Sequence, residues 1–275
     1  MLTIAQITDL HITSDKDPLN KARNEQRLRI VLKAIHERRP RPVAIIASGD
    51  LVDRGEYEEY VELKKIFDQV EIPLYLGLGN HDRRVAFRSV FPRTPVDEYG
   101  FVQYAADLGG VRLAMCDTLD EGKNGGAFCE KRVAGLQRML EEDARTPTIV
   151  ALHHPPIISG IQWMDPSPDA DWIGRLAKTI EGRTQIRSVI CGHVHRAFHG
   201  MLAGQMISAS PATSIQLTLN LTPVDMRVPD GREILIDEPP GYTLLMCDKE
   251  RFVTHVCVAG DFAPAVTYDV PFVKD

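Results

Sequence analysis

The chain has 275 residues, of which 44% are hydrophobic and 25% are charged. This composition is typical of a globular protein with a substantial core, and it excludes a disordered or low-complexity chain. The formal net charge of −6 repels polyanions on average, so we expect no polymeric nucleic acid as a partner. No apolar run approaches the roughly 20 residues that cross a bilayer, so we expect no membrane segment.

Cysteine usage and the N-terminus indicate a cytoplasmic protein. The five cysteines form no CxxC pair, a pattern typical of reduced thiols. Residues 1–8 are apolar but lack a positively charged region and a cleavage site, so they predict a first strand and not a signal peptide. We therefore expect the protein in the cytoplasm.

The first half of the chain alternates short apolar runs with stretches whose apolar residues recur at helical spacing. The apolar runs predict buried strands at residues 3–8, 43–47 and 74–77. The helical spacing predicts amphipathic helices at residues 20–38 and 56–68. The first helix is expected to end before two closely spaced prolines.

The second half continues this alternation and then becomes rich in strands. Gly109 and Gly110 predict a hairpin between two of the strands. We expect strands at 101–106, 111–116, 148–152, 188–191, 198–202, 205–208, 242–247 and 252–258, and helices at 130–142 and 172–181. This order predicts an α/β fold in which two sheets form a β-sandwich flanked by helices, with a β-rich C-terminal segment.

Five short polar clusters directly follow, or nearly follow, apolar strands. In chain order they are Asp9-Leu10-His11, Gly49-Asp50, Gly79-Asn80-His81-Asp82, His153-His154 and Gly192-His193-Val194-His195. The first two clusters alone are weak signals, because such residues also occur on ordinary surfaces. The later three are more specific, and Gly192-His193-Val194-His195 is the strongest single signal. Carboxylate, imidazole and carboxamide groups at five successive strand ends are what a two-metal hydrolytic site requires.

The chemistry of the clusters supports this interpretation. If the segment is extended, Asp9 and His11 point to the same side and can share one ion. Asp50 has two oxygens and can bridge two cations, while the amide oxygen of Asn80 adds coordination without charge. His81 is then free to face a substrate.

The candidate ligand set contains nitrogen and oxygen donors but no thiolate. Its seven members are Asp9, His11, Asp50, Asn80, His153, His193 and His195. This donor set suits two divalent metal ions of the first row, namely Mn²⁺, Fe²⁺/Fe³⁺, Zn²⁺ or Co²⁺.

The motif order DxH, GD, GNHD, H and GHxH resembles that of the calcineurin-like metallophosphoesterase superfamily, over roughly residues 3–215. Within it, the chain is most similar to bacterial class III 3′,5′-cyclic nucleotide phosphodiesterases and glycerophosphodiesterases. Residues 208–214 and 238–242 also resemble that subgroup. The resemblance implies a catalytic domain at 1–215, and a loop and strands at 216–275 that complete the sandwich and serve in homo-oligomers.

The resemblance also implies roles for the candidate residues. Asp9, His11 and His195 would bind one metal ion, Asn80, His153 and His193 the other, and Asp50 both. His81 would contact the phosphoryl oxygen or protonate the leaving alkoxide, and Asn80 would also lie against the substrate. Arg54, within a GDLVDRG segment similar to that of the protein serine/threonine phosphatases, is an alternative substrate contact.

The implied reaction is hydrolysis of a small phosphodiester by a metal-activated hydroxide. A 3′,5′-cyclic nucleotide such as cyclic AMP is favoured, with a glycerophosphodiesterase or a broad-specificity enzyme as the alternative. A nuclease with the same motifs is disfavoured by the acidic balance, and a non-catalytic scaffold by the complete ligand set. The long segments 155–171 and 218–241 are either lids and specificity elements or surface excursions.

Overall fold

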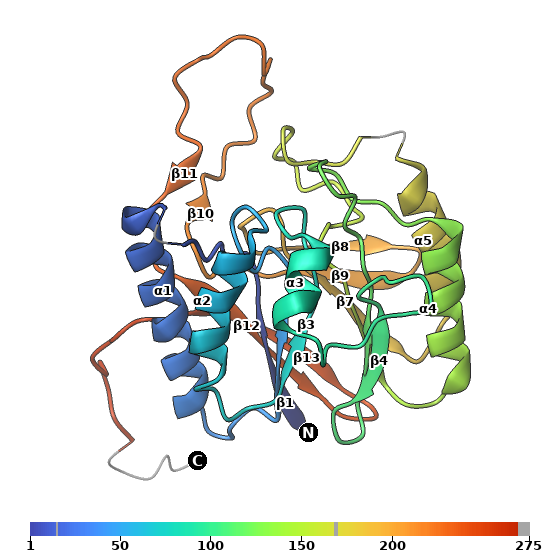
Figure 1. The fold of residues 1–275 in the computed structure, drawn as a ribbon. Helices are drawn as coiled ribbons and strands as arrows, with labels where there is room; N and C mark the ends of the chain where they lie inside the picture. Colours follow the sequence, from blue (N-terminus) through green and yellow to red (C-terminus); the bar gives the residue numbers. More distant parts are fainter. Residues whose placement is uncertain (15, 168–169, 269–275) are drawn as a thin grey trace, which may run out of the picture.

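The computed structural model describes residues 1–14, 16–167 and 170–268, which form two large sheets between two layers of helices (Figure 1). Helices α1 (Pro18–Glu37) and α2 (Tyr57–Phe67) lie on one side of the molecule. Helices α4 (Glu130–Glu142) and α5 (Asp171–Ile180) lie on the other. This arrangement confirms the predicted α/β sandwich flanked by helices.

The first sheet has the strand order β13-β12-β1-β2-β3. Its strands are β1 (Leu2–Ile7), β2 (Ala44–Ala47), β3 (Leu74–Leu76), β12 (Gly241–Cys247) and β13 (Phe252–Val258). β1, β2 and β3 are parallel, whereas β12 is antiparallel to β1 and β13 to β12. The C-terminal segment therefore contributes a strand beside β1, while a domain boundary after residue 215 stays a prediction.

The second sheet has the order β4-β5-β6-β7-β9-β8. Its strands are β4 (Tyr104–Asp107), β5 (Arg112–Met115), β6 (Thr148–Ala151), β7 (Ile186–Cys191), β8 (Phe198–Leu202) and β9 (Gln205–Ala209). β5, β6, β7 and β9 are parallel, and the predicted β4–β5 hairpin turns at Gly109 and Gly110.

Strand alternation distributes the side chains of the second sheet between two cores. Leu113 and Met115 of β5 pack in the core that also contains buried residues of β1 and β2. Ala114 and Cys116, which alternate with them, pack in a second core with residues of α4 and α5. A side-chain period of two residues therefore lets one sheet contact the other sheet on one face and helices on the opposite face.

Three elements were not predicted from the sequence. In helix α3 (Arg84–Val90) only Phe87 and Val90 are buried. Two buried residues in seven give a pattern too short for helical spacing to be detected in the sequence. Strands β10 (Gln216–Leu217) and β11 (Leu235–Ile236) pair at the base of the second long loop, which projects from the body of the molecule (Figure 1). Within the described part of the chain, none of the helices has the length and apolar character to traverse a bilayer.

Candidate metal centre

The predicted ligands lie just beyond the carboxyl ends of parallel strands, and both sheets contribute them. The first sheet supplies Asp9 and His11 after β1, Asp50 after β2 and Asn80 after β3, and the second supplies His153 after β6 and His193 and His195 after β7. Parallel neighbours end at the same edge, so loops far apart in sequence meet there. The candidate centre therefore spans the junction of the two sheets.

Several predicted ligands have a backbone conformation that residues with side chains rarely adopt. Asp9, His11, Asp50, His193 and His195 all have φ between 46° and 71°. Each such residue costs of order 1–3 kcal/mol, and residues of this kind cluster at functional sites. Among the described residues, only one other non-glycine residue, Ala203, has a positive φ.

The expectation that residues 9–11 are extended is wrong. The segment turns, because the N–H of Asp9 donates to the Gly49 carbonyl and those of Leu10 and His11 donate to the Asp50 carbonyl, over 2.8–3.1 Å. The side chains of Asp9 and His11 nevertheless lie close together. The left-handed backbone conformation of both residues brings them together, and strand alternation plays no part.

The first group of side chains contains Asp9, His11 and His195, whose ligand atoms lie within 4.8 Å of one another. Nε2 of His11 lies 3.1 Å from Nε2 of His195. The same His195 nitrogen lies 3.5 Å from a carboxylate oxygen of Asp9. Nδ1 of His195 lies 2.7 Å from the Ile215 carbonyl and is therefore the protonated nitrogen. The Nε2 lone pair of His195 then faces the interior of the group.

The second group contains His153, His154 and His193, whose ligand atoms lie within 4.8 Å of one another, and Asn80 lies beside it. Nδ1 of His193 lies 2.9 Å from the amide oxygen of Asn80. Nδ1 of His153 lies 3.1 Å from the Ser48 carbonyl, so its Nε2 is left for another partner. That Nε2 is buried, makes no hydrogen bond and lies 3.2 Å from Asp50 Oδ2.

Asp50 lies between the two groups. It belongs to one set of close ligand atoms with His11 and His81 and to another with Asp9 and His153. Its carboxylate is almost fully buried, and one oxygen accepts the His81 backbone N–H at 2.9 Å. A buried carboxylate in contact with both groups is suited to bridge two cations.

The electrostatics of the centre favour added positive charge. Burial opposes ionisation of Asp50, but the close contact with His153 and the charges of the neighbouring histidines together outweigh it and hold the pKa of the carboxyl well below its usual range. Burial also opposes protonation of His153, yet Asp50 raises its pKa to about 9. Burial and the charge of His153 lower the pKa of His193 to about 3. A bound cation would replace the proton on His153, since ligating imidazoles must be neutral.

His81 is held between the centre and an adjoining cavity. Its Nδ1 lies 2.6 Å from the Asp53 carbonyl, so Nδ1 carries the proton and Nε2 is available to a ligand. His81 also lines a cavity of about 510 Å³ together with Asp50, Asn80, His193 and His195. Asp53 further contacts the ring of His11 at 3.4 Å, a supporting role that sequence spacing did not reveal.

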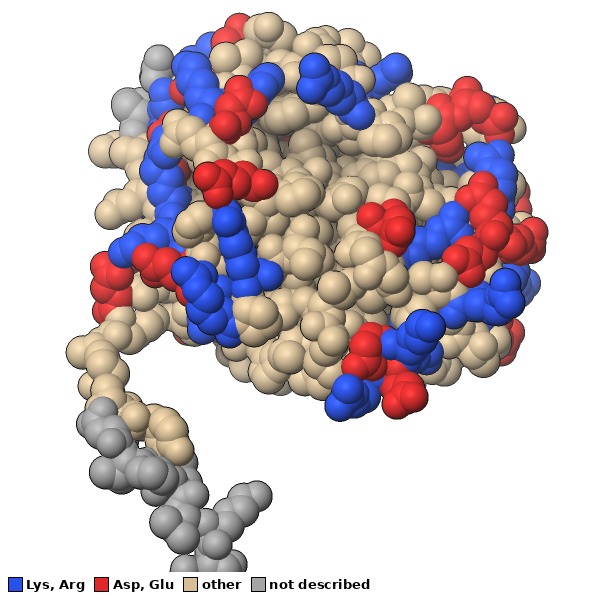
Figure 2. All heavy atoms as spheres, turned by 90° about the horizontal axis from the view of Figure 1, so that it is seen from below, with Lys and Arg blue, Asp and Glu red and all other residues tan. Residues whose placement is uncertain are grey.

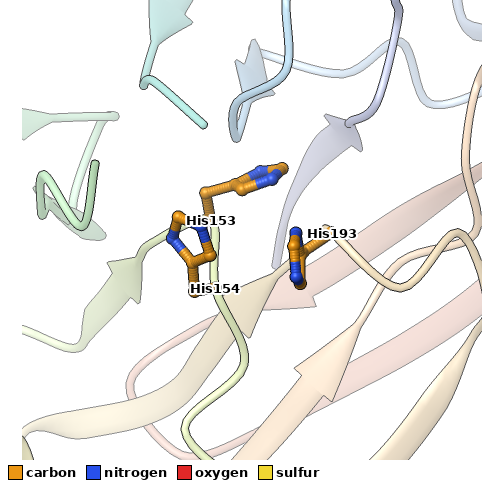
Figure 3. A group of neighbouring side chains, drawn as sticks. All are labelled: His153, His154 and His193. Carbon is orange, nitrogen blue, oxygen red and sulfur yellow. The ribbon is translucent and has the colours of Figure 1, made fainter. Parts of the chain in front are cut away.

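His154 occupies a different place from its neighbour. The two rings are nearly perpendicular and leave the chain on different sides, while His193 approaches from the next loop (Figure 3). Nδ1 of His154 lies 2.8 Å from the Thr118 hydroxyl, and its buried Nε2 has no hydrogen-bond partner. Burial and the charge of His193 hold the pKa of His154 well below its usual range. His154 therefore forms a neutral wall of the cavity.

Glycines before the ligands allow the loops to approach one another. A Cβ at Gly192 would overlap the Thr8 hydroxyl and lie 2.8 Å from an Asp9 oxygen. A Cβ at Gly79 would overlap the Asp50 carboxylate and lie 2.7 Å from His153 Cδ2. Arg54, by contrast, is half-exposed, lies 3.8 Å from Asp53 and does not line the cavity.

The fold, the strained turns and the converging Asp and His donors together are those of a metal-dependent phosphoesterase. The family model of the calcineurin-like phosphoesterases matches residues 2–197, and the chain belongs to that family. This confirms the family predicted from the motifs. Divalent metal ions serve the family, and the Asp and His groups described above are the side chains available to hold them.

Three known proteins illustrate the similarity. A protein named probable cyclic nucleotide phosphodiesterase, from Rhodopseudomonas palustris, is 30% identical over 91% of this chain and 90% of its own. A probable glycerophosphodiester phosphodiesterase from Arcobacter nitrofigilis is 26% identical over 95% and 94%. A solved dimetal phosphatase from Danio rerio has a TM-score of 0.62 at 13% identity, covering 92% of this chain and 98% of its own, which confirms the fold.

Proposed function

We propose that the chain is a binuclear-metal-dependent phosphodiesterase that hydrolyses a small phosphodiester, with a 3′,5′-cyclic nucleotide such as cyclic AMP as the favoured substrate. The observation that carries the proposal is the pair of donor groups that meet at Asp50. Relatives named as cyclic nucleotide phosphodiesterases support the substrate class.

We assign the donors to two ions as the resemblance implies. Asp9, His11 and His195 would hold one ion, Asn80, His153 and His193 the other, and Asp50 both. The nitrogen and oxygen donors fit Mn²⁺, Fe²⁺/Fe³⁺, Zn²⁺ or Co²⁺. When bound, two such ions supply an activated water and neutralise charge on the phosphoryl oxygens.

The protein's own groups orient the substrate and move a proton. His81, whose Nδ1–H donates to the Asp53 carbonyl, lines the cavity and would protonate the leaving alkoxide from Nε2 when its ring is doubly protonated, ending as the neutral imidazole. General acid catalysis of this kind contributes roughly 10²–10⁴-fold. Asn80 lines the same cavity and would lie against the phosphate. No described Lys or Arg lines the cavity, which suits a diester with one negative charge better than a monoester with two.

The end of the molecule where the parallel strands begin, away from the site, offers no continuous track for a polyanion. In Figure 2, seen from below, basic and acidic side chains on that face are interspersed around an uncharged central area. We extend the proposal to a cytoplasmic enzyme that forms homo-oligomers through its β-rich C-terminal segment. β13 is the edge strand of its sheet and is available for such pairing.

Variants of Asp50 and His81 test the proposal. His81→Ala should lower kcat for cyclic AMP by about 10²-fold or more and keep two metal ions per chain, because it removes a proton donor and no ligand. Asp50→Ala should lose both metal and activity, because it removes the shared carboxylate. Metal analysis and initial rates with Mn²⁺ separate the two roles, with His199→Ala, an exposed histidine on β8, as the matched control.

Equal metal loss in both variants would contradict the role given to His81. A glycerophosphodiesterase is the second candidate, which the relative from Arcobacter nitrofigilis favours. Faster hydrolysis of glycerophosphodiesters than of cyclic AMP by the unaltered protein would select it.

A further inference from the structure

The cavity beside the donors has an apolar side built by the two long loops. Trp163 and Met164 come from the first loop and Met226 from the second, and all three line the cavity together with the strand-end residues. The volume of about 510 Å³ lies within the roughly 300–1,000 Å³ of sites for small molecules. A larger hollow of about 750 Å³ adjoins the same loop, but none of the candidate ligands lines it.

The first loop is braced in place. Asp165 accepts the N–H and the hydroxyl of Ser159, both at 2.6 Å, and the N–H of Gly160 at 3.1 Å. The loop also contacts the second loop directly, since the Val224 N–H donates to the side-chain oxygen of Gln162 at 2.9 Å. Trp163 therefore stands beside a cross-link between the two loops.

The apolar side is also attached to a metal-ligand loop. Ile161 and Val194 belong to one small buried cluster, and Trp163 and Met164 pack against it. Val194 separates His193 from His195, so the same turn that presents the two imidazoles supports the tryptophan. This connection fixes the distance between the apolar side and the donors.

The charges of the cavity indicate what binds there. Among the described residues it has no Lys or Arg, and its acids are Asp50 and Asp165. Asp50 belongs to the donor groups, and both oxygens of Asp165 already accept hydrogen bonds from the loop. Trp163, Met164 and Met226 thus give the cavity apolar surface and an aromatic ring.

We propose that Trp163 and Met226 bind a flat aromatic ring carried by the phosphodiester, namely the base of a cyclic nucleotide, and thereby select nucleotides over glycerol diesters. The inference rests on the proposed phosphodiesterase function and assigns its specificity to two residues. A tryptophan face accepts any base, because every base has a π-face that can stack on it. A quaternary ammonium such as choline is the competing ligand for the same ring face.

Rates with paired substrates test the assignment. For Trp163→Ala, the ratio of kcat/KM for cyclic AMP to kcat/KM for glycerophosphoglycerol should fall tenfold or more, mainly through KM for cyclic AMP, and Trp163→Phe should restore much of it. Met226→Ala should lower the ratio less. Val228→Ala, which removes an exposed apolar side chain that lies two residues further along and does not line the cavity, should leave it unchanged.

Fluorescence gives a second readout that does not need turnover. The chain has two tryptophans, Trp163 and the buried Trp172, and both line the cavity, so the Trp163→Phe variant reports the signal of Trp172 alone. In metal-loaded protein, AMP should quench the emission and glycerol 3-phosphate should not, and the quenching should disappear in Trp163→Phe. Undiminished quenching in that variant would overturn the assignment.

The outcomes separate this inference from the function on which it rests. If the unaltered protein hydrolyses none of the diesters, the proposed function fails, and the AMP titration alone decides whether Trp163 binds a base. If cyclic AMP is hydrolysed and Trp163→Ala leaves the ratio unchanged, only the inference fails. A selective loss of glycerophosphocholine hydrolysis would overturn it in favour of choline recognition.

Discussion

At the scale of single residues, the candidate centre depends on backbone shape as much as on ligand chemistry. Five of the seven predicted ligands have a left-handed backbone conformation, with a positive φ. Glycines stand next to several of them in the chain. The cost of such turns must be offset by the surrounding sheets. The turn residues therefore specify the site jointly with the donors themselves.

Gly192→Ala tests this dependence on close approach. The added Cβ would overlap the Thr8 hydroxyl and press on Asp9, so we expect a loss of about 1–3 kcal/mol in the free energy of unfolding together with weaker metal retention. Gly174→Ala in α5 is the matched control, because its Cβ meets nothing within 4 Å and alanine stabilises a helix by roughly 0.5–1 kcal/mol. Urea unfolding and metal analysis of both variants measure the difference. A Gly192→Ala protein with unchanged stability and full metal content would refute the argument.

At the scale of secondary-structure elements, a buried arginine connects α1 to the loop beside the centre. Arg27 donates to the Ser214 carbonyl at 2.8 Å, to the Asp237 carboxylate at 2.8 Å and to the Glu238 carbonyl. The Ser214 N–H in turn donates to the Asp9 carbonyl at 3.1 Å, and the next carbonyl along the chain fixes the ring of His195. The helix thereby holds the loop that positions ligands of the first group.

Removing this guanidinium should loosen that loop. Arg27→Met leaves buried acceptors without donors, so we expect unfolding to become easier by about 1.5–3 kcal/mol and metal affinity to fall. Arg29→Met changes an exposed arginine on the same helix and should stay within about 0.5 kcal/mol of the unaltered protein. Denaturant unfolding and a metal-binding titration compare the pair. Equal stability and metal affinity for both variants would show that the contact has no such role.

The sequence predicted those elements whose signals are local. The strands before Asp9, Asp50 and His153 were found because their apolar runs are continuous, and the polar clusters marked where each strand ends. The turn at residues 9–11 was not predictable, because the carbonyls of Gly49 and Asp50 that shape it arrive only when β1 and β2 pair. The roles of Arg27 and Trp163 likewise depend on segments that are distant in sequence.

At the scale of the whole molecule, the candidate centre joins the two sheets. Asp9, His11, Asp50 and Asn80 come from the first sheet, whereas His153, His193 and His195 come from the second. The sheets also share a core, in which residues of β1 and β2 pack with alternate residues of β5 and β6. Bound ions would reinforce this junction, and the apolar side of the cavity stands beside it on the long loops.

Activity as a function of metal content tests the central claim most directly. Metal-stripped protein is titrated with Mn²⁺ while the initial rate of cyclic AMP hydrolysis is followed. We expect no turnover without metal and a rate that reaches its plateau at two ions per chain, because Asp50 joins two donor groups. Full activity in the stripped protein, or a plateau at one ion per chain, would contradict the account.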